Sequence, residues 1–372
     1  MHHPPRRRGL AGLAAKATLA AAMALPAATT GAVSARAAAG QHEAAPNEYV
    51  AVGDSFASGA GLAPKDSASP GGTDCRRSTG DYAHLLAAGN GWALTDVTCS
   101  GGRIGEENES AGQGGGFYRS LPYAQDNPPM LGAVDSRTQY VTFQLGGNDS
   151  GITEAMKNCL KDGVAQRNDP RAALCEKRVE EHRDGYRIDL VRTRNRAVKA
   201  LRAIRRKAPD ARVVVLGYPL VLPLGRAPRH CPFTVDVYPG RAQGFGPVSV
   251  PDQEFFAQRL AELNTVLRRA AREGGAAFAD LARVFQGHDA CQARDQRWIH
   301  RVLADVPMTH QDGSPYERPA NPFSPEGLAY LNQAIDGDGR EPLWASGHPN
   351  TKGHEETARI LATTAFPARA GR

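Results

Sequence analysis

Short runs of β-branched and aromatic residues alternate along this chain with amphipathic stretches of helical period. Five runs have the composition of buried strands: residues 49–52, 95–98, 140–145, 212–217 and 276–280. Helices are predicted around residues 82–88, 190–207, 256–270 and 351–364. Strands that alternate with helices favour a parallel sheet covered on both faces. The sequence therefore predicts an α/β domain with a central parallel sheet of about five strands.

Three of the predicted strands end in glycine beside a polar residue. These endings are Gly53-Asp54-Ser55, Cys99-Ser100-Gly101 and Gly146-Gly147-Asn148-Asp149. Open α/β sheets bind ligands beyond the carboxyl ends of their strands, so we expect the three endings to meet at one edge of the sheet. Taken alone, residues 53–59 fit a second interpretation at least as well, in which Asp54 and Ser55 only cap a following helix.

A serine at such an edge becomes a nucleophile only with a base and with donors for the developing negative charge. His348, in His348-Pro349-Asn350, is the predicted base for Ser55. The backbone N–H groups of Ser55 and Gly101 and the side-chain amide of Asn148 are the predicted oxyanion hole. Gly101 suits this role because a residue without a Cβ lets backbone and substrate approach closely.

These four motifs, in this order, resemble the four blocks of the SGNH/GDSL hydrolase superfamily. The sequence is most similar to the secreted actinobacterial esterases and lipases with three disulfides, over most of residues 48–362. The resemblance implies a flavodoxin-like three-layer αβα sandwich and hydrolysis of carboxylic esters through an acyl-serine. It also implies that no metal and no organic cofactor takes part. The G-x-S-x-G nucleophile elbow is absent around Ser55, which argues against the α/β-hydrolase fold.

Six cysteines remain beyond the N-terminal segment, and an even count in an exported protein indicates three disulfides. The cysteines alone leave the pairing open. The family resemblance implies that consecutive cysteines pair: Cys75 with Cys99, Cys159 with Cys175, and Cys231 with Cys291. Residues 153–186 contain the middle pair and are predicted to form a disulfide-closed helical insert.

Many members of this superfamily carry an acidic residue three positions before the catalytic histidine, and here that position is Ala345. We therefore expect a backbone carbonyl, that of Ala345 or Ser346, to accept the Nδ1–H of His348, which makes the site a Ser–His dyad. The alternative is an acid supplied from elsewhere, with Asp338 and Glu341 the nearest in sequence.

Other polar residues near the motifs receive structural interpretations. His354 is the alternative base, but it lies on the final predicted helix, where a capping or core role is expected. Asp54 and Asp149 are expected to stabilise turns through backbone N–H groups. Four further histidines fall in loops and are expected at the surface: His230, His288, His300 and His310.

Residues 1–37 have the pattern of an export signal: three consecutive arginines, an alanine-rich stretch and a small-x-small cleavage pattern. A membrane anchor is the alternative, and the pattern does not separate the Sec route from the twin-arginine route. A short tail, residues 38–47, then precedes a single hydrolase domain at 48–364, with loop insertions near 105–129 and 284–344. We expect a secreted, extracellular protein.

Removal of the signal leaves 40 basic and 39 acidic side chains, so the basic isoelectric point is no indication of nucleic-acid binding. The basic run at 192–207 is expected to be a solvated helix face opposite a stripe that includes Leu190, Val191 and Val198. We expect a monomer without stable membrane insertion.

The sequence thus predicts an extracellular esterase or lipase that acts on a small ester or lipid. Phospholipase and acetyl-sugar esterase activity are alternatives on the same residues, and a non-catalytic ligand-binding protein is a further one. The polar composition of the long loops favours short-chain or polar esters over triglyceride.

Overall fold

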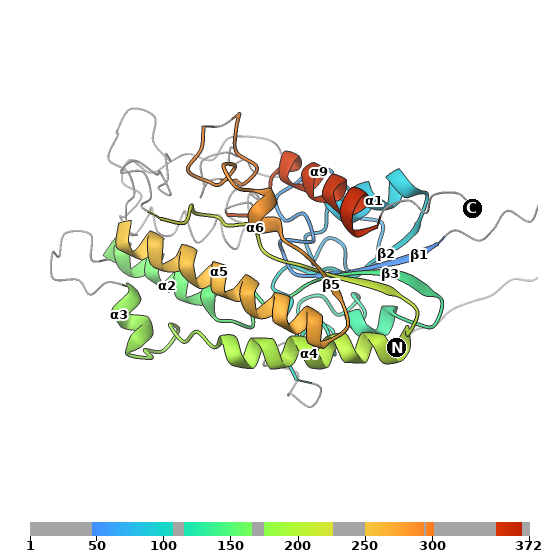
Figure 1. Cartoon of the computed structure of the whole chain (residues 1–372), viewed down its shortest axis with the longest axis horizontal. Coiled ribbons are helices and arrows are strands. Elements are labelled where there is room, and N and C mark those ends of the chain that lie inside the picture. Colours follow the sequence, from blue (N-terminus) through green and yellow to red (C-terminus); the bar gives the residue numbers. More distant parts are fainter. Residues whose placement is uncertain are drawn as a thin grey trace, which may run out of the picture. The chain divides into compact units, whose positions relative to one another are not determined.

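The computed structural model describes residues 47–106, 115–165, 175–225, 250–293, 295–300 and 347–366. These residues fall in one compact unit around a five-stranded parallel sheet of order β2-β1-β3-β4-β5 (Figure 1). The strands are β1 Glu48–Gly53, β2 Ala93–Asp96, β3 Thr138–Gln144, β4 Arg212–Leu216 and β5 Ala277–Ala279. This is the flavodoxin-like order, so the predicted fold class is confirmed.

Strands β1 and β3 pair at the centre of the sheet, and their apolar residues are buried except for the half-buried Tyr140. The hydroxyl groups of Tyr49 and Thr142 join them by a 2.8 Å hydrogen bond. Strand β2 begins and ends two residues earlier than predicted, but the chain continues beside β1. The Cys99 N–H donates to the Gly53 carbonyl at 2.9 Å. The second glycine-rich ending is thus held next to the first.

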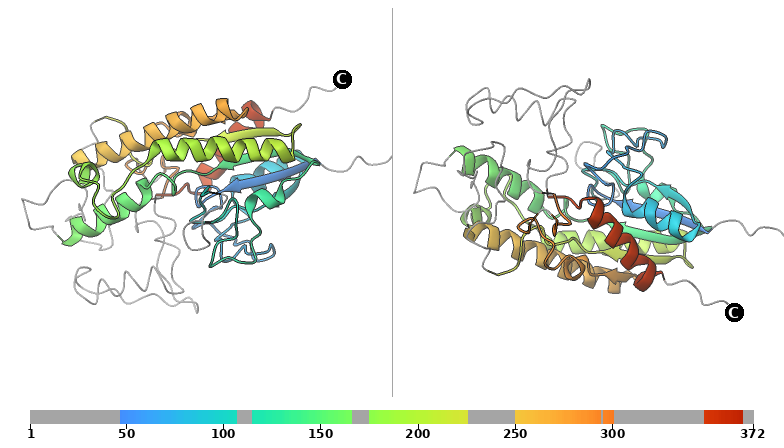
Figure 2. Two further views of the ribbon diagram at one scale, coloured as in Figure 1. Left: turned by 90° about the horizontal axis from the view of Figure 1, so that it is seen from below. Right: turned by 90° about the horizontal axis from the view of Figure 1, so that it is seen from above.

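Helices cover both faces of the sheet, as the alternating pattern predicted (Figures 1 and 2). Helices α1, Tyr82–Asn90, and α9, Thr351–Ile360, pack together on one face, and α4, Leu190–Lys207, and α5, Val250–Glu273, pack on the other. Asn350 is the N-cap of α9 and accepts the Gly353 N–H at 3.0 Å. Beyond Ile360 the helix continues as a π-helical turn, Leu361–Ala365, which the sequence pattern did not separate from the α-helix.

The predicted helical insert consists of α2, Ile152–Ala165, and α3, Cys175–Glu180, joined by the Cys159–Cys175 disulfide. The Cys75–Cys99 pairing is also present. The third predicted pairing involves Cys231, which lies outside the described residues. Two shorter elements complete the description: η1, Met130–Ala133, and α6, Leu281–Val284. No described helix is long and apolar enough to cross a membrane.

Helix α4 differs from its predicted amphipathic pattern at two positions. Val191, expected on the apolar stripe, is 70% exposed. Arg196, expected in the solvated basic run, is buried and lies 3.2 Å from both Asp149 and Glu106. The rest of the predicted stripe is buried at Val198, Leu201 and Ile204, and the buried face also takes in Ala197 and Ala200.

Candidate active site

Ser55 lies in a tight turn directly after β1. The Asp54 carbonyl accepts N–H groups from Ala57 at 3.0 Å and Ser58 at 2.9 Å, so one helical turn begins at the serine. The Asp54 side chain accepts the Phe56 N–H at 3.0 Å. Strand β1 lies between β2, which follows it toward one edge of the sheet, and β3, which leads toward the other edge. In such folds, ligands bind beside the strand at which the order reverses.

His348 reaches this turn from the far end of the sequence. Its Nε2 lies 2.7 Å from the Ser55 Oγ. The segment that carries it pairs with residues 298–300: the His300 N–H donates to the His348 carbonyl at 2.9 Å, and the Gly347 N–H donates to the His300 carbonyl at 3.0 Å. The Phe56 ring packs against the imidazole with the centroids 4.6 Å apart. The predicted nucleophile and base are therefore brought together.

The residues predicted to orient His348 lie outside the described part of the chain. This holds for Ala345 and Ser346 and for the alternative acids Asp338 and Glu341. The backbone-carbonyl interpretation thus stays a prediction.

His354 is a core residue, as expected, and its place excludes the role of base. It is 1% exposed, and its Nδ1 accepts the Tyr82 N–H at 3.1 Å. Its ring stacks on that of Tyr82 with the centroids 6.1 Å apart. Burial lowers the pKa of His354 to about 4, so the ring is neutral near pH 7.

His300 and His288 depart from the expectation of ordinary surface residues. The main chain of His300 holds the segment of His348, as described above. His288 stacks on Trp298 with the ring centroids 3.6 Å apart and has its Nδ1 2.6 Å from the Gln296 carbonyl. No sequence spacing pointed to this support, because the contacts on His348 are made by backbone atoms. The other two loop histidines, His230 and His310, lie outside the described residues.

The predicted oxyanion donors lie on three turns that the structure links to one another. The Asn148 Nδ2 donates to the Gly102 carbonyl at 3.0 Å. Among the described residues, the backbone N–H groups of Ser55 and Gly101 have no acceptor. Gly101 has φ 80°, and a Cβ there would collide with the Tyr123 hydroxyl. Glycine is thus favoured at 101 by the backbone conformation, and a Cβ there would also require the Tyr123 hydroxyl to move.

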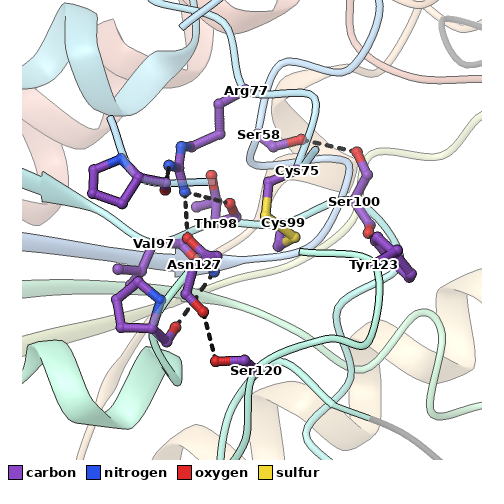
Figure 3. The surroundings of a disulfide bond; sticks show 12 residues. Ser58, Cys75, Arg77, Val97, Thr98, Cys99, Ser100, Ser120, Tyr123 and Asn127 are labelled. Atoms are coloured by element: carbon purple, nitrogen blue, oxygen red, sulfur yellow. Dashed lines mark hydrogen bonds between the residues drawn. A yellow bond between two sulfur atoms is a disulfide. The ribbon is translucent and has the colours of Figure 1, made fainter. Parts of the chain in front are cut away.

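The Cys75–Cys99 disulfide connects the loop after Ser55 with the turn that carries Gly101 (Figure 3). Beside it, the Ser100 N–H donates to the Cys75 carbonyl at 3.0 Å, and the Ser58 and Ser100 hydroxyls lie 3.2 Å apart. The bridge and these hydrogen bonds hold the nucleophile turn and the Gly101 turn in one arrangement.

Arg77 is a fully buried guanidinium next to this disulfide (Figure 3). It forms an ion pair with Asp66 at 3.3 Å and donates to Asn127 Oδ1 at 2.7 Å and the Thr98 carbonyl at 3.1 Å. A buried charge requires such partners. The sequence carries no signal for this role of Arg77, because an arginine in a Gly/Pro/Ser loop has the appearance of a surface residue.

Within the part of the chain that the structure describes, Asp54 has only uncharged donors. Its Oδ2 lies 2.6 Å from the Tyr218 hydroxyl, and its Oδ1 accepts the Phe56 N–H. Burial raises the pKa of Asp54 from 3.8 to about 7, although these hydrogen bonds oppose the rise.

Asp149 is also buried but has a cation. It accepts the N–H groups of Ile104 at 2.8 Å and Gly105 at 3.0 Å, and Arg196 lies 3.2 Å away. Burial raises the pKa of Asp149, and the backbone donors and then Arg196 oppose that rise. The predicted turn-stabilising role is confirmed for both aspartates, with the difference that Asp149 fixes the loop at 104–105 rather than its own turn.

Two groups of described residues have ligand-type atoms within 4.8 Å of one another. In one of them Cys159 and Cys175 form a disulfide, so their sulfurs are not free to bind a metal. The other consists of Asp81, His84 and Asp96. Asp81 caps α1 through the His84 N–H at 2.9 Å, and the His84 Nδ1 lies 3.0 Å from the same oxygen. Helix capping and ion pairing explain this second group.

Comparisons with known proteins agree with this geometry. The sequence profile of the GDSL-like Lipase/Acylhydrolase family matches residues 51–356. Lipase 2 of Streptomyces coelicolor is 34% identical over 69% of this chain and 77% of the relative. The crystal structure of an extracellular lipase from Streptomyces rimosus has a TM-score of 0.55 at 25% identity, covering 86% of this chain and 99% of that one. Phospholipase A1 from Streptomyces albidoflavus shares the fold, with a TM-score of 0.51 at 24% identity over 86% of this chain and 100% of that one. With its serine, histidine and glycine-rich turns gathered at the sheet edge, this chain is a carboxylic ester hydrolase and belongs to the GDSL-like lipase/acylhydrolase family.

Proposed function

We propose that the protein hydrolyses esters through an acyl-enzyme on Ser55, with His348 as general base. The observation that carries the proposal is the 2.7 Å distance between His348 Nε2 and Ser55 Oγ. The imidazole takes the hydroxyl proton as the oxygen attacks the ester carbonyl, and then gives it to the leaving alcohol. In the second half of the reaction, water attacks the acyl-serine. His348 takes the proton of the water and returns it to the Ser55 oxygen.

The negative charge of each tetrahedral intermediate is held by the N–H groups of Ser55 and Gly101 and by the Asn148 amide. Support comes from the two backbone donors that have no acceptor among the described residues. The link from Asn148 to the Gly102 carbonyl uses one amide hydrogen and leaves the other for the oxyanion. The loss of one such donor typically costs about 3–4 kcal/mol of transition-state stabilisation.

A fluorophosphonate probe tests the assignment of the nucleophile. We expect the full chain to be labelled once, at Ser55, and Ser55→Ala to be unlabelled and slower by at least about 10³-fold. Ser58→Ala is the matched control, because Ser58 lies in the same turn and its hydroxyl faces Ser100. Labelling of the Ser55→Ala variant, or its loss in the control alone, would sink the assignment.

We propose further that the protein is exported and acts on short-chain or polar esters. The disulfides at Cys75–Cys99 and Cys159–Cys175 are typical of an oxidising compartment. The N-terminal sequence of the protein recovered from culture medium should begin after the predicted signal, near residue 38.

A series of p-nitrophenyl esters, with acetylated sugars and phosphatidylcholine vesicles as further substrates, separates an esterase from a phospholipase. Highest turnover on long chains or vesicles would contradict the preference for short or polar esters.

A further inference from the structure

The hydroxyl of Tyr218 lies between the two turns to which the catalytic groups are attached. Tyr218 follows β4 by two residues and is 1% exposed. Its oxygen is 2.6 Å from the Asp54 Oδ2 and 2.9 Å from the Gly147 nitrogen. Asp54 directly precedes Ser55, and Gly147 directly precedes Asn148. One hydroxyl thus connects the nucleophile turn with the turn that bears the amide of the oxyanion hole.

The direction of the protons in this link follows from its chemistry. The Gly147 N–H can only donate, so the Tyr218 oxygen is its acceptor and the Tyr218 O–H points to Asp54. Burial, and then the neighbouring Asp54 carboxylate, raise the pKa of Tyr218 well above its ordinary value, so the hydroxyl keeps its proton. The Asp54 carboxylate therefore has a donor on each oxygen, Tyr218 on one and the Phe56 N–H on the other.

Tyr218 is itself held from the helix layer. Asn264 of α5 bonds both of its backbone groups: the Tyr218 N–H donates to Asn264 Oδ1 at 2.7 Å, and the Asn264 Nδ2 donates to the Tyr218 carbonyl at 2.8 Å. The Phe56 ring meets the Tyr218 ring edge to face at 5.2 Å and the His348 ring at 4.6 Å. The tyrosine therefore contacts a residue that lies against the base as well.

The hydrogen bond between Gly147 and Tyr218 brings the tyrosine ring so close to Gly147 that little room is left for a side chain there. A Cβ at position 147 would lie 3.1–3.2 Å from three atoms of the Tyr218 ring and hydroxyl. The Gly147 carbonyl is in turn the acceptor of the Ser150 hydroxyl at 2.7 Å. Gly147 is therefore fixed at both of its backbone polar groups, by Tyr218 at its nitrogen and by Ser150 at its carbonyl oxygen.

We propose that Tyr218 is a positioning residue, which sets the distance between the Ser55 nucleophile and the Asn148 oxyanion donor through Asp54 and Gly147. We name Asp54, Tyr218 and Gly147 the tyrosine bridge. The proposal rests on the proposed function, because the bridge matters for turnover only if Ser55 and Asn148 carry the reaction. The bridge does not touch the substrate, so its loss should lower kcat and leave KM nearly unchanged.

Tyr218→Phe removes the hydroxyl and keeps the ring. We expect kcat to fall about 10- to 100-fold with KM within about twofold, as a displacement on the order of an ångström does in an active site. Tyr82→Phe is the matched control: Tyr82 is also 1% exposed, and its hydroxyl donates to Thr142 at 3.3 Å, within the sheet core. The control should keep kcat within about twofold, since no catalytic group lies on that contact.

Labelling by the fluorophosphonate separates misplacement from misfolding. Tyr218→Phe should reach the same final labelling at Ser55 as the wild-type chain, but more slowly. A loss of activity that only matches a smaller labelled fraction, or a kcat within about twofold of the wild type, would overturn the proposal. Absence of labelling in the wild-type chain would instead overturn the proposed nucleophile.

A double-mutant cycle keeps the proposal testable if Tyr218→Phe folds poorly at high temperature. Gly147→Ala presses on the same ring, so its effect on kcat and that of Tyr218→Phe should be strongly non-additive. Additive effects would overturn the bridge. The cycle is measured on kcat at a temperature at which all four chains label completely.

Discussion

Asp54 and Asp149 are two buried aspartates that stand beside catalytic groups and differ in how their charge is compensated. Asp54 has a tyrosine hydroxyl and one backbone N–H. Asp149 has two backbone N–H groups and the guanidinium of Arg196. The first carboxylate is held by uncharged donors and titrates near neutral pH, whereas the second is part of an ion pair. Of these two carboxylates, that of Asp54 is therefore expected to give the larger change of stability with pH.

The largest expected effect comes from the charge of Asp54. Because burial raises its folded pKa from 3.8 to about 7, the folded state binds the proton more tightly, and stability falls as the pH rises from about 4 to about 7. Relative to Asp54→Asn, the unfolding free energy of the wild-type chain should fall by about 4 kcal/mol across this window, because each pKa unit corresponds to about 1.4 kcal/mol. Denaturant unfolding near pH 4 and near pH 8 measures the difference.

Asp149→Asn is the control for that experiment. Burial raises the pKa of Asp149 too, but Arg196 and the two backbone donors oppose the rise. The pH-dependent difference in unfolding free energy between the wild-type chain and Asp149→Asn should therefore be clearly smaller than the one measured with Asp54→Asn. Equal differences for the two variants would break the comparison between the aspartates.

Removal of the cation from Asp149 should cost about 3 kcal/mol of unfolding free energy. Arg196→Met keeps an apolar stem and leaves a buried carboxylate without its charged partner, for which the usual loss is about 3–5 kcal/mol. The lower end is expected because Ile104 and Gly105 still donate to Asp149. Lys199→Met, at an exposed ion pair with Glu106, is the control and should change little. A similar loss in both variants would contradict the role given to Arg196.

Tyr218→Phe should also shift the pH at which Asp54 titrates. The Tyr218 hydrogen bond is the largest of the contacts that lower the Asp54 pKa, so its removal should raise that pKa further. The charged groups that face Asp54 include Asp149, which acts in the same upward direction. We expect the pH window over which the folded chain loses stability to extend to higher pH in this variant than in the wild-type chain, as measured by denaturant unfolding. An unmoved window would contradict the Tyr218 hydrogen bond as a contact that lowers the Asp54 pKa.

The smallest effect is expected at the outer edge of the ion pair. Glu106 shares Arg196 with Asp149 but is partly exposed, so its contribution is screened by solvent. Glu106→Gln should cost about 0.5 kcal/mol in denaturant unfolding. A loss as large as that of Arg196→Met would place the main partner of the guanidinium at Glu106 instead.

Much of the fold was predictable because its signals are local. Alternation of strands and helices gave the parallel sheet, and the glycine-rich endings gave Ser55, Gly101 and Asn148. His348 required the family motifs as well, since 293 residues separate it from Ser55. What the sequence missed depends on distant pairs: Arg196 with Asp149, Tyr218 with Asn264, and Arg77 with Asn127. Each of these buried polar residues has an ordinary local pattern, and its partner is identified only once the chain is folded.

The pairing of residues 298–300 with the segment of His348 has a consequence for evolution. The bonds run between main-chain atoms, so they survive a change of the side chain at position 300 as long as the backbone path is kept. Support by main-chain hydrogen bonds therefore does not require a particular residue type at position 300. A search for invariant residues in relatives would find the histidine and overlook the segment that holds it, whereas insertions or deletions near position 300 should be rare among active enzymes.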